Sequence, residues 1–151
     1  MALTFDILSK VSGVEVLVKP HTRTGKDAGI YRNLPLPNVA DVSSVELCEW
    51  ADVMLVIASS IVIEMLKQGK PVLYLKYLHE NTTEYEEFGA CWTIRDETEL
   101  QAAVQSLRGA KTEVPYEEKD VARWLSEVIN GGQGERDVLK DYEEFIVSCA
   151  N

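Results

Sequence analysis

The sequence contains two short apolar runs that are separated by a helical pattern. Val53–Ile57 and Val72–Leu75 are apolar almost throughout, which is typical of strands covered on both faces of a sheet. A helix that runs to Gln68 and ends at Gly69 is predicted between them. Strand, helix and strand in this order predict a βαβ unit, and therefore a parallel sheet with helices on its faces.

Similar patterns predict the remaining elements. We expect helices at Leu3–Lys10, after the capping box of Ser43 and Glu46, after Asp96, around Val121–Val128 and from Val138 to Ile146, and further strands at Val14–Val18, Asn38–Ala40 and Cys91–Ile94. Together they predict one α/β domain over residues 1–151, with a three-layer, Rossmann-like parallel sheet. Such domains usually begin with a strand. We therefore expect the first strand to lie upstream of Met1, and the chain to be a fragment of a two-domain protein.

The charge of the chain argues against two classes of partner. Its 25 acidic and 15 basic residues give a net charge of −10, whereas non-specific binding to nucleic acid or to an anionic membrane needs a basic face. No apolar run reaches the roughly 20 residues of a membrane span, and the N-terminus lacks the pattern of a signal peptide. A phosphate ligand is still compatible with this charge, because a helix N-terminus binds anions locally.

The cysteines indicate a reducing environment. Cys48, Cys91 and Cys149 are odd in number and show no CxxC spacing, so neither a disulfide framework nor a zinc site is indicated. We expect three reduced thiols, a cytoplasmic location, and no metal or cofactor.

Polar side chains follow three of the predicted strands, Val14–Val18, Val53–Ile57 and Val72–Leu75. Lys19 and His21 follow the first, with Arg23 close behind, Ser59 and Ser60 follow the second, and Lys76 follows the third. Because parallel strands end at the same edge of a sheet, and ligands bind outside that edge, these side chains are predicted to converge. The helix start at the two serines adds backbone N–H donors and a favourable dipole. This edge is therefore predicted to bind phosphate.

Glu64 lies four residues after Ser60, one helical turn further on the same face. A capping box needs its glutamate three residues after the cap, so Glu64 is not required for capping. Its carboxylate is placed to accept hydrogen bonds from the ribose of a nucleotide whose phosphates lie on the serines. Two simpler interpretations stay open. The serines can act as helix caps alone, and Glu64 can be a solvated residue that pairs with Lys67 or Gln68.

The order of these motifs resembles a known family. The matching segments are Val14–His21, "ADVMLVIASSIVIEMLKQGKPVLYL" from Ala51 to Leu75, and within it Ser59-Ser60, Glu64-Met65-Leu66 and Gly69-Lys70-Pro71-Val72. They resemble the C-terminal domain of GT-B-type transferases. The CDP-glycerol glycerophosphotransferase and capsule polysaccharide group is most similar, followed by the UDP-GlcNAc 2-epimerase group. The resemblance covers roughly residues 11–108.

This resemblance implies a site for a UDP-sugar or CDP-alcohol donor, as used in surface polysaccharide synthesis. Ser59 and Ser60 would contact phosphate, Glu64 would bind the ribose, and His21, assisted by Lys19, would approach the donor phosphates. The acceptor would bind a separate N-terminal domain. We therefore expect this chain to hold a donor without completing a transfer alone.

A second hypothesis stays open. The chain can be a non-catalytic α/β assembly module, with Trp124, Tyr142 and Phe145 exposed at an interface. Self-association is left open in both cases. A receiver-like domain is disfavoured, because its strand ends would carry an acidic cluster. His79 follows a strand more loosely than His21, and we do not place it in the predicted site.

Overall fold

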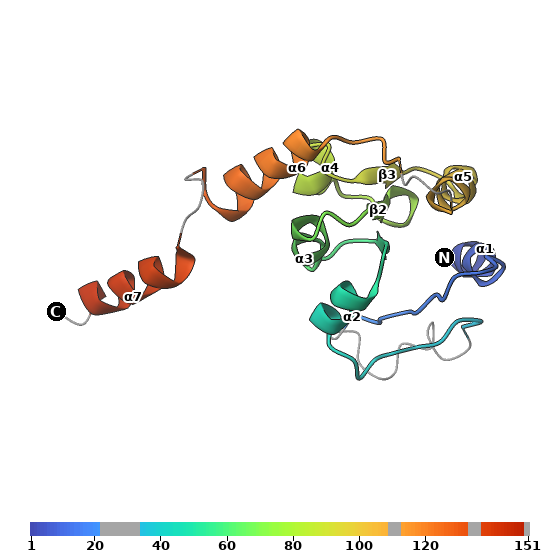
Figure 1. Ribbon diagram of the computed structural model, residues 1–151, viewed down its shortest axis with the longest axis horizontal. Coiled ribbons are helices and arrows are strands. Elements are labelled where there is room, and N and C mark those ends of the chain that lie inside the picture. Colours follow the sequence, from blue (N-terminus) through green and yellow to red (C-terminus); the bar gives the residue numbers. More distant parts are fainter. Residues whose placement is uncertain (22–33, 109–112, 133–136, 150–151) are drawn as a thin grey trace.

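The computed structural model describes residues 1–21, 34–108, 113–132 and 137–149 and shows an α/β fold (Figure 1). Within these ranges, the strands β1 (Met54–Val56), β2 (Val72–Leu75) and β3 (Trp92–Ile94) form a parallel sheet in that order. Val56 pairs with Tyr74, so the ends of β1 and β2 lie side by side. The general shape is Rossmann-like, and these three strands confirm the predicted parallel sheet.

Helices cover both faces of the sheet. The elements α2 (Ser44–Trp50), α3 (Val62–Lys67), α4 (Glu84–Glu87) and α6 (Glu118–Trp124) contribute to one hydrophobic cluster, and α1 (Ala2–Ser9) and α5 (Glu97–Leu107) to a second. A 3-10 turn, η3 (Lys76–Leu78), follows β2, and a π-helical stretch, η4 (Leu125–Ile129), continues α6. Figure 1 shows α1 and α5 side by side at the end of the molecule opposite α6.

Strand β2 explains why the apolar run at Val72–Leu75 has no polar alternation. Val72 and Tyr74 belong to the cluster under α3 and α6, whereas Leu73 and Leu75 belong to the cluster under α5. All four side chains are buried. Burial of side chains of this size stabilises a fold by roughly 1.5–3 kcal/mol each, so this strand contributes to the core on both faces.

The two strands predicted at Val14–Val18 and Asn38–Ala40 are not strands of this sheet. The segments meet in one parallel bridge between Val18 and Asn38, where the Val39 N–H donates to the Val18 carbonyl over 3.0 Å. Val14 is 51% exposed. The apolar residues of Val14–Val18 gave the prediction, but a strand also needs a continuous partner, and this segment has only a single bridge.

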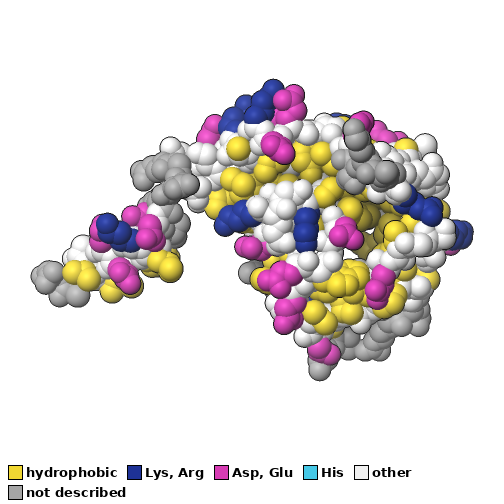
Figure 2. All heavy atoms as spheres, viewed as in Figure 1, with side chains coloured by type: hydrophobic (Ala, Val, Ile, Leu, Met, Phe, Trp, Pro, Cys, Tyr) yellow, Lys and Arg dark blue, Asp and Glu magenta, His cyan; other side chains and the backbone are white. Residues whose placement is uncertain are grey.

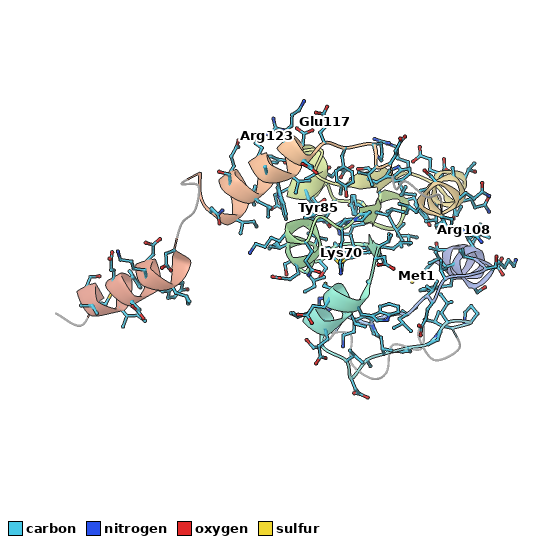
Figure 3. All side chains as sticks on the ribbon, viewed as in Figure 1. Met1, Lys70, Tyr85, Arg108, Glu117 and Arg123 are labelled. Carbon is cyan, nitrogen blue, oxygen red and sulfur yellow. The ribbon has the colours of Figure 1, made fainter. Side chains whose placement is uncertain are left out.

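Side chains fix the ends of several helices. Ser43 and Glu46 form the predicted capping box of α2, and Asp96 accepts a hydrogen bond from the Glu99 N–H at the start of α5 over 2.8 Å. At the other end of α2, the Lys70 ammonium donates to the Cys48 and Glu49 carbonyl oxygens, both over 2.8 Å. Figure 3 shows Lys70 beside α3, in the region between the sheet and α2.

The last helix, α7 (Val138–Cys149), extends away from the rest of the molecule (Figure 1). Its large apolar side chains are exposed: Leu139 79%, Tyr142 65%, Phe145 64%, Ile146 60% and Val147 61%. Figure 2 shows them along one side of α7, with charged side chains along the other. Trp124, which the assembly hypothesis expected to be exposed with Tyr142 and Phe145, is instead buried in the core. None of the described helices is long and apolar enough to cross a membrane.

Candidate functional site

A cavity of about 450 Å³ lies at the carboxyl end of β1. It is lined by residues of three segments, namely Pro20, His21, Ser44, Val45, Ser59, Ser60, Ile61, Ile63 and Glu64. Four residues of the predicted site, His21, Ser59, Ser60 and Glu64, are therefore brought together at one surface. The first of them is 38 residues away from the next along the chain, so their meeting is a result of the tertiary fold.

Three N–H groups at the turn from β1 into α3 have partners within the turn. The Ile61 N–H donates to Ser59 Oγ over 3.4 Å, the Ile63 N–H to the Ser60 carbonyl over 3.2 Å, and the Glu64 N–H to the Ile61 carbonyl over 3.1 Å. The helix has Ile61 as its N-cap and begins at Val62, later than predicted. The helix start predicted at the serines therefore lies at Ile61 instead, and the N–H groups of Ile61, Ile63 and Glu64 are already bonded within the turn. The serine hydroxyls add side-chain donors for an anion at this point.

Lys19 does not line the cavity. Its ammonium donates to the carbonyl oxygen of Ala40 and, over 2.7 Å, to that of Val42. These bonds fasten the segment before Pro20 and His21 to the segment that leads into α2, and so help to position His21. Arg23, the other predicted basic residue, lies outside the described residues.

Glu64 is half-buried and faces the side of α2. Burial raises the pKa of the Cys48 thiol, and the charge of Glu64 raises it further, whereas Lys70 opposes the shift. Neither Lys67 nor Gln68, both described by the structure, forms a hydrogen bond or ion pair with Glu64. The local pairing considered from the sequence is thus absent from this part of the chain, and the carboxylate is available to a ligand in the cavity.

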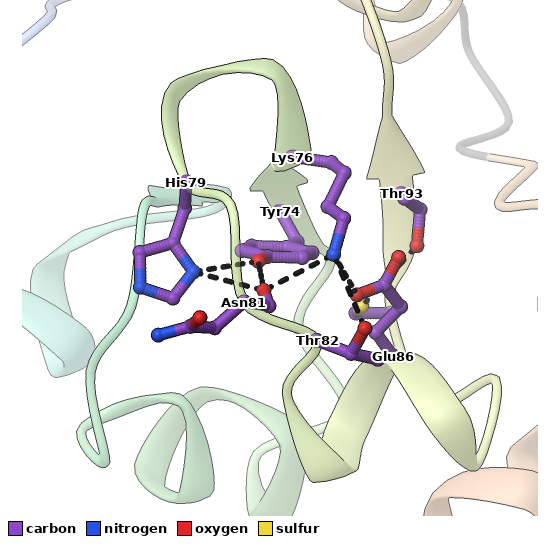
Figure 4. Close-up of polar contacts among 8 residues, drawn as sticks. Tyr74, Lys76, His79, Asn81, Thr82, Glu86 and Thr93 are labelled. Carbon is purple, nitrogen blue, oxygen red and sulfur yellow. Dashed lines mark hydrogen bonds and ion pairs between the residues drawn. The ribbon is translucent and has the colours of Figure 1, made fainter.

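A second polar cluster lies at the end of β2 (Figure 4). Lys76 was predicted at this edge of the sheet, but its grouping with Tyr74, His79 and Asn81 was not. The Tyr74 hydroxyl lies 3.0 Å from His79 Nδ1 and donates to the Asn81 carbonyl over 2.8 Å. The Lys76 ammonium donates to the same carbonyl and to Glu86, both over 3.0 Å. One signal was present in the sequence, because Tyr74 interrupts an otherwise aliphatic strand. A buried tyrosine usually finds a partner for its hydroxyl.

Tyr85 connects the two regions. Its ring meets the Tyr74 ring edge-on, with 5.5 Å between centroids. Burial raises the pKa of Tyr85, and the Thr83 side chain and the Ser59 backbone oppose the shift, so the phenol lies behind the Ser59 loop. The Tyr85 hydroxyl is nevertheless buried without a hydrogen bond of normal geometry, as are Thr83 Oγ1 and Trp124 Nε1. Ser59 therefore lines the cavity and, through its backbone, also contacts this aromatic cluster.

A smaller cavity, of about 240 Å³, lies between α1 and α5. Its lining includes Leu3, Ile7 and Val104, together with Asp6 and Lys10, which form an ion pair of 2.5 Å with each other. It contains no residue of the predicted site. The mutual neutralisation of its two charges makes it less suited to a phosphate than the larger cavity.

Within the described ranges, no group of three or more histidine, cysteine, aspartate or glutamate side chains is arranged to hold a metal ion. Comparison of the chain with protein-family models, with curated proteins and with solved structures gave no match.

Proposed function

We propose that this chain is the donor-nucleotide-binding domain of a glycosyl- or glycerophosphotransferase of surface polysaccharide synthesis, of the GT-B C-terminal type. The donor is a UDP-sugar or a CDP-alcohol, and the acceptor binds a separate N-terminal domain. One observation carries the proposal: His21, Ser59, Ser60 and Glu64 line one cavity at the carboxyl edge of a parallel sheet. Ligands of open α/β sheets bind at this edge.

The lining suits the parts of a nucleoside diphosphate. The Ser59 and Ser60 hydroxyls donate to the phosphate oxygens, and the Glu64 carboxylate accepts from the ribose hydroxyls. His21 adds a donor from the opposite segment. The volume of about 450 Å³ lies within the range of small-molecule sites. The proposal implies a cytoplasmic protein, in keeping with three free cysteines.

The contribution to transfer is electrostatic. When the bond between the transferred group and the nucleotide breaks, negative charge accumulates on the departing phosphate. Fixed donors aimed at that charge lower the barrier. Ser59, Ser60 and His21 are placed for this role, while the proton of the acceptor hydroxyl is removed by a group of the acceptor domain. The chain alone is expected to bind a donor without turning it over.

Calorimetric titration of the full chain with UDP and CDP tests the proposal. We expect binding of at least one nucleotide, weakened about three- to tenfold by Ser60→Ala and about tenfold or more by Glu64→Gln. Ser106→Ala and Glu97→Gln on α5 are matched controls and leave affinity unchanged. If neither nucleotide binds, or if the cavity variants bind as tightly as the controls, the proposal is wrong.

One observation favours the second candidate, a module for assembly. Helix α7 exposes Leu139, Tyr142, Phe145 and Ile146 on one side, and an isolated helix of this length gains most of its stability from packing. Sedimentation measurements over a wide concentration range check it. A concentration-independent monomer contradicts self-association, whereas association that Phe145→Glu abolishes supports it.

A further inference from the structure

His79 lies at the end of β2 with a defined tautomer. Its Nδ1 is 3.0 Å from the Asn81 carbonyl oxygen, an atom that only accepts hydrogen bonds. Nδ1 therefore carries the proton. The neighbouring Tyr74 hydroxyl, also 3.0 Å from Nδ1, is consistent with this, because its own single proton is donated to Asn81. In the neutral ring, Nε2 is left with a lone pair, and no described residue donates to it.

The surrounding bonds hold this ring in place. The Asn81 carbonyl oxygen accepts from Tyr74 over 2.8 Å and from Lys76 over 3.0 Å, and Lys76 is fixed in turn by Glu86. The Lys76 and Glu86 side chains are only 24% and 17% exposed. Lys76 also binds Thr82 over 3.4 Å, so all three of its protons have partners and it is not available to a phosphate. His79 keeps a ring nitrogen, Nε2, that this network does not use.

The position of His79 relative to the cavity follows from the sheet. Val56 pairs with Tyr74, so the loop after β1 and the loop after β2 leave neighbouring points of the same edge. Tyr85 and Tyr74 connect the Ser59 backbone to His79 through ring contacts of 5.5 and 6.2 Å between centroids. Glu64 lines the cavity, whereas His79 does not line it and follows β2, the strand that neighbours β1 at this edge of the sheet.

We propose that His79 contacts the transferred group of the donor, with Nε2 accepting a hydrogen bond from one of its hydroxyls. This inference rests on the proposed function. A diphosphate on Ser59 and Ser60, with its ribose toward Glu64, directs its other end along the edge toward β2. The hydroxyl-bearing sugar or polyol then reaches Nε2 of His79. This hydrogen-bond acceptor has a fixed orientation because Asn81 and Tyr74 hold the ring. His79 thus contacts the sugar or polyol of the donor, which UDP and CDP alone lack.

The variant His79→Asn separates this role from a purely structural one. Its amide N–H replaces Nδ1–H toward the Asn81 carbonyl, but nothing replaces Nε2. We expect the wild-type chain to bind UDP-glucose or CDP-glycerol about three- to tenfold more tightly than the matching diphosphate. His79→Asn reduces this ratio to about one, leaves the affinity for the diphosphate unchanged and melts like the wild type.

The outcomes are distinguishable. If UDP and CDP do not bind at all, the proposed function fails and this inference fails with it. If they bind with the expected effects of Ser60→Ala and Glu64→Gln, but the wild-type ratio is about one or is unchanged in His79→Asn, only the role of His79 is wrong. Nitrogen-15 NMR of the ring at a pH where it is neutral gives an independent readout. A proton on Nε2 instead of Nδ1 would overturn the inference.

Discussion

The ammonium of Lys70 lies 2.8 Å from the carbonyl oxygen of Cys48, and so links the turn before β2 to the C-terminal end of α2. A cation at this end of a helix satisfies carbonyl groups that have no partner within the helix. We expect Lys70→Met to lower the free energy of unfolding by about 1–3 kcal/mol. Lys67→Met, at an exposed position in the last turn of α3, is the matched control and changes stability by less than about 0.5 kcal/mol. Urea unfolding of both variants checks the difference, and equal stabilities would show that the Lys70 bonds contribute little.

Two tyrosines of the same cluster are expected to respond oppositely to loss of their hydroxyls. Tyr74→Phe removes the bonds to His79 and Asn81, which we expect to cost about 1–2 kcal/mol of stability. Tyr85→Phe removes a buried hydroxyl that has no hydrogen bond of normal geometry, so we expect a neutral effect or a gain of up to about 1 kcal/mol. Thermal unfolding of the two variants tests the pair. A destabilised Tyr85→Phe would indicate a partner for that hydroxyl in solution.

The cysteines are expected to differ in reactivity. Cys48 and Cys91 are buried, while Cys149 is exposed on α7. Because thiol reagents attack the accessible thiolate, one thiol per chain should react rapidly with DTNB in the native state, and three in denaturant. Cys149→Ser should abolish the rapid phase. Rapid reaction of two or more thiols in native protein would contradict the packing of α2 or β3.

Stability is expected to fall at alkaline pH. Burial raises the pKa of the Cys91 thiol from 9.0 to about 12, so between these values the unfolded chain releases a proton that the folded chain keeps. The folded state is therefore destabilised as pH rises, by up to about 1.4 kcal/mol per pH unit from this group. Burial also raises the pKa of Tyr74, Tyr85 and Tyr116, which adds to the slope above pH 10. Cys91→Ala should have a shallower slope of unfolding free energy between pH 9 and 12 than the wild type.

The sheet was predictable where the sequence contains its own signals. Val72–Leu75 has an apolar run that matches double-sided burial, and Ser43 with Glu46 specifies a local cap, so both predictions are confirmed. Val14–Val18 failed because its apolar residues say nothing about whether a neighbouring strand exists. The hydrophobic pattern of a segment indicates which of its side chains are buried. Whether the segment pairs as a strand depends on other segments that are distant in the sequence.

In the candidate site, too, some features follow from the local sequence and others depend on contacts between distant segments. His21 was predicted to lie near Ser59 and Ser60, and the three residues do line one cavity, although the segment before His21 is not a strand of the sheet. The bonds of Lys19 to Ala40 and Val42 could not be foreseen, because they join a side chain to backbone carbonyls 21 and 23 residues away. Lys76 was expected at the sheet edge, but its network around Asn81 was not, because the central acceptor is a main-chain oxygen that every residue possesses.

Strand β2 contributes side chains to both hydrophobic clusters, which makes the two layers of helices mutually dependent. Loosening of α5 would expose Leu73 and Leu75, and loosening of α3 or α6 would expose Val72 and Tyr74. Neither layer can therefore open without weakening the strand that supports the other, and the sheet with its flanking helices behaves as one cooperative unit. Helix α7 lies outside this unit, so it is free to fray or change partner while the ligand-facing edge keeps its shape.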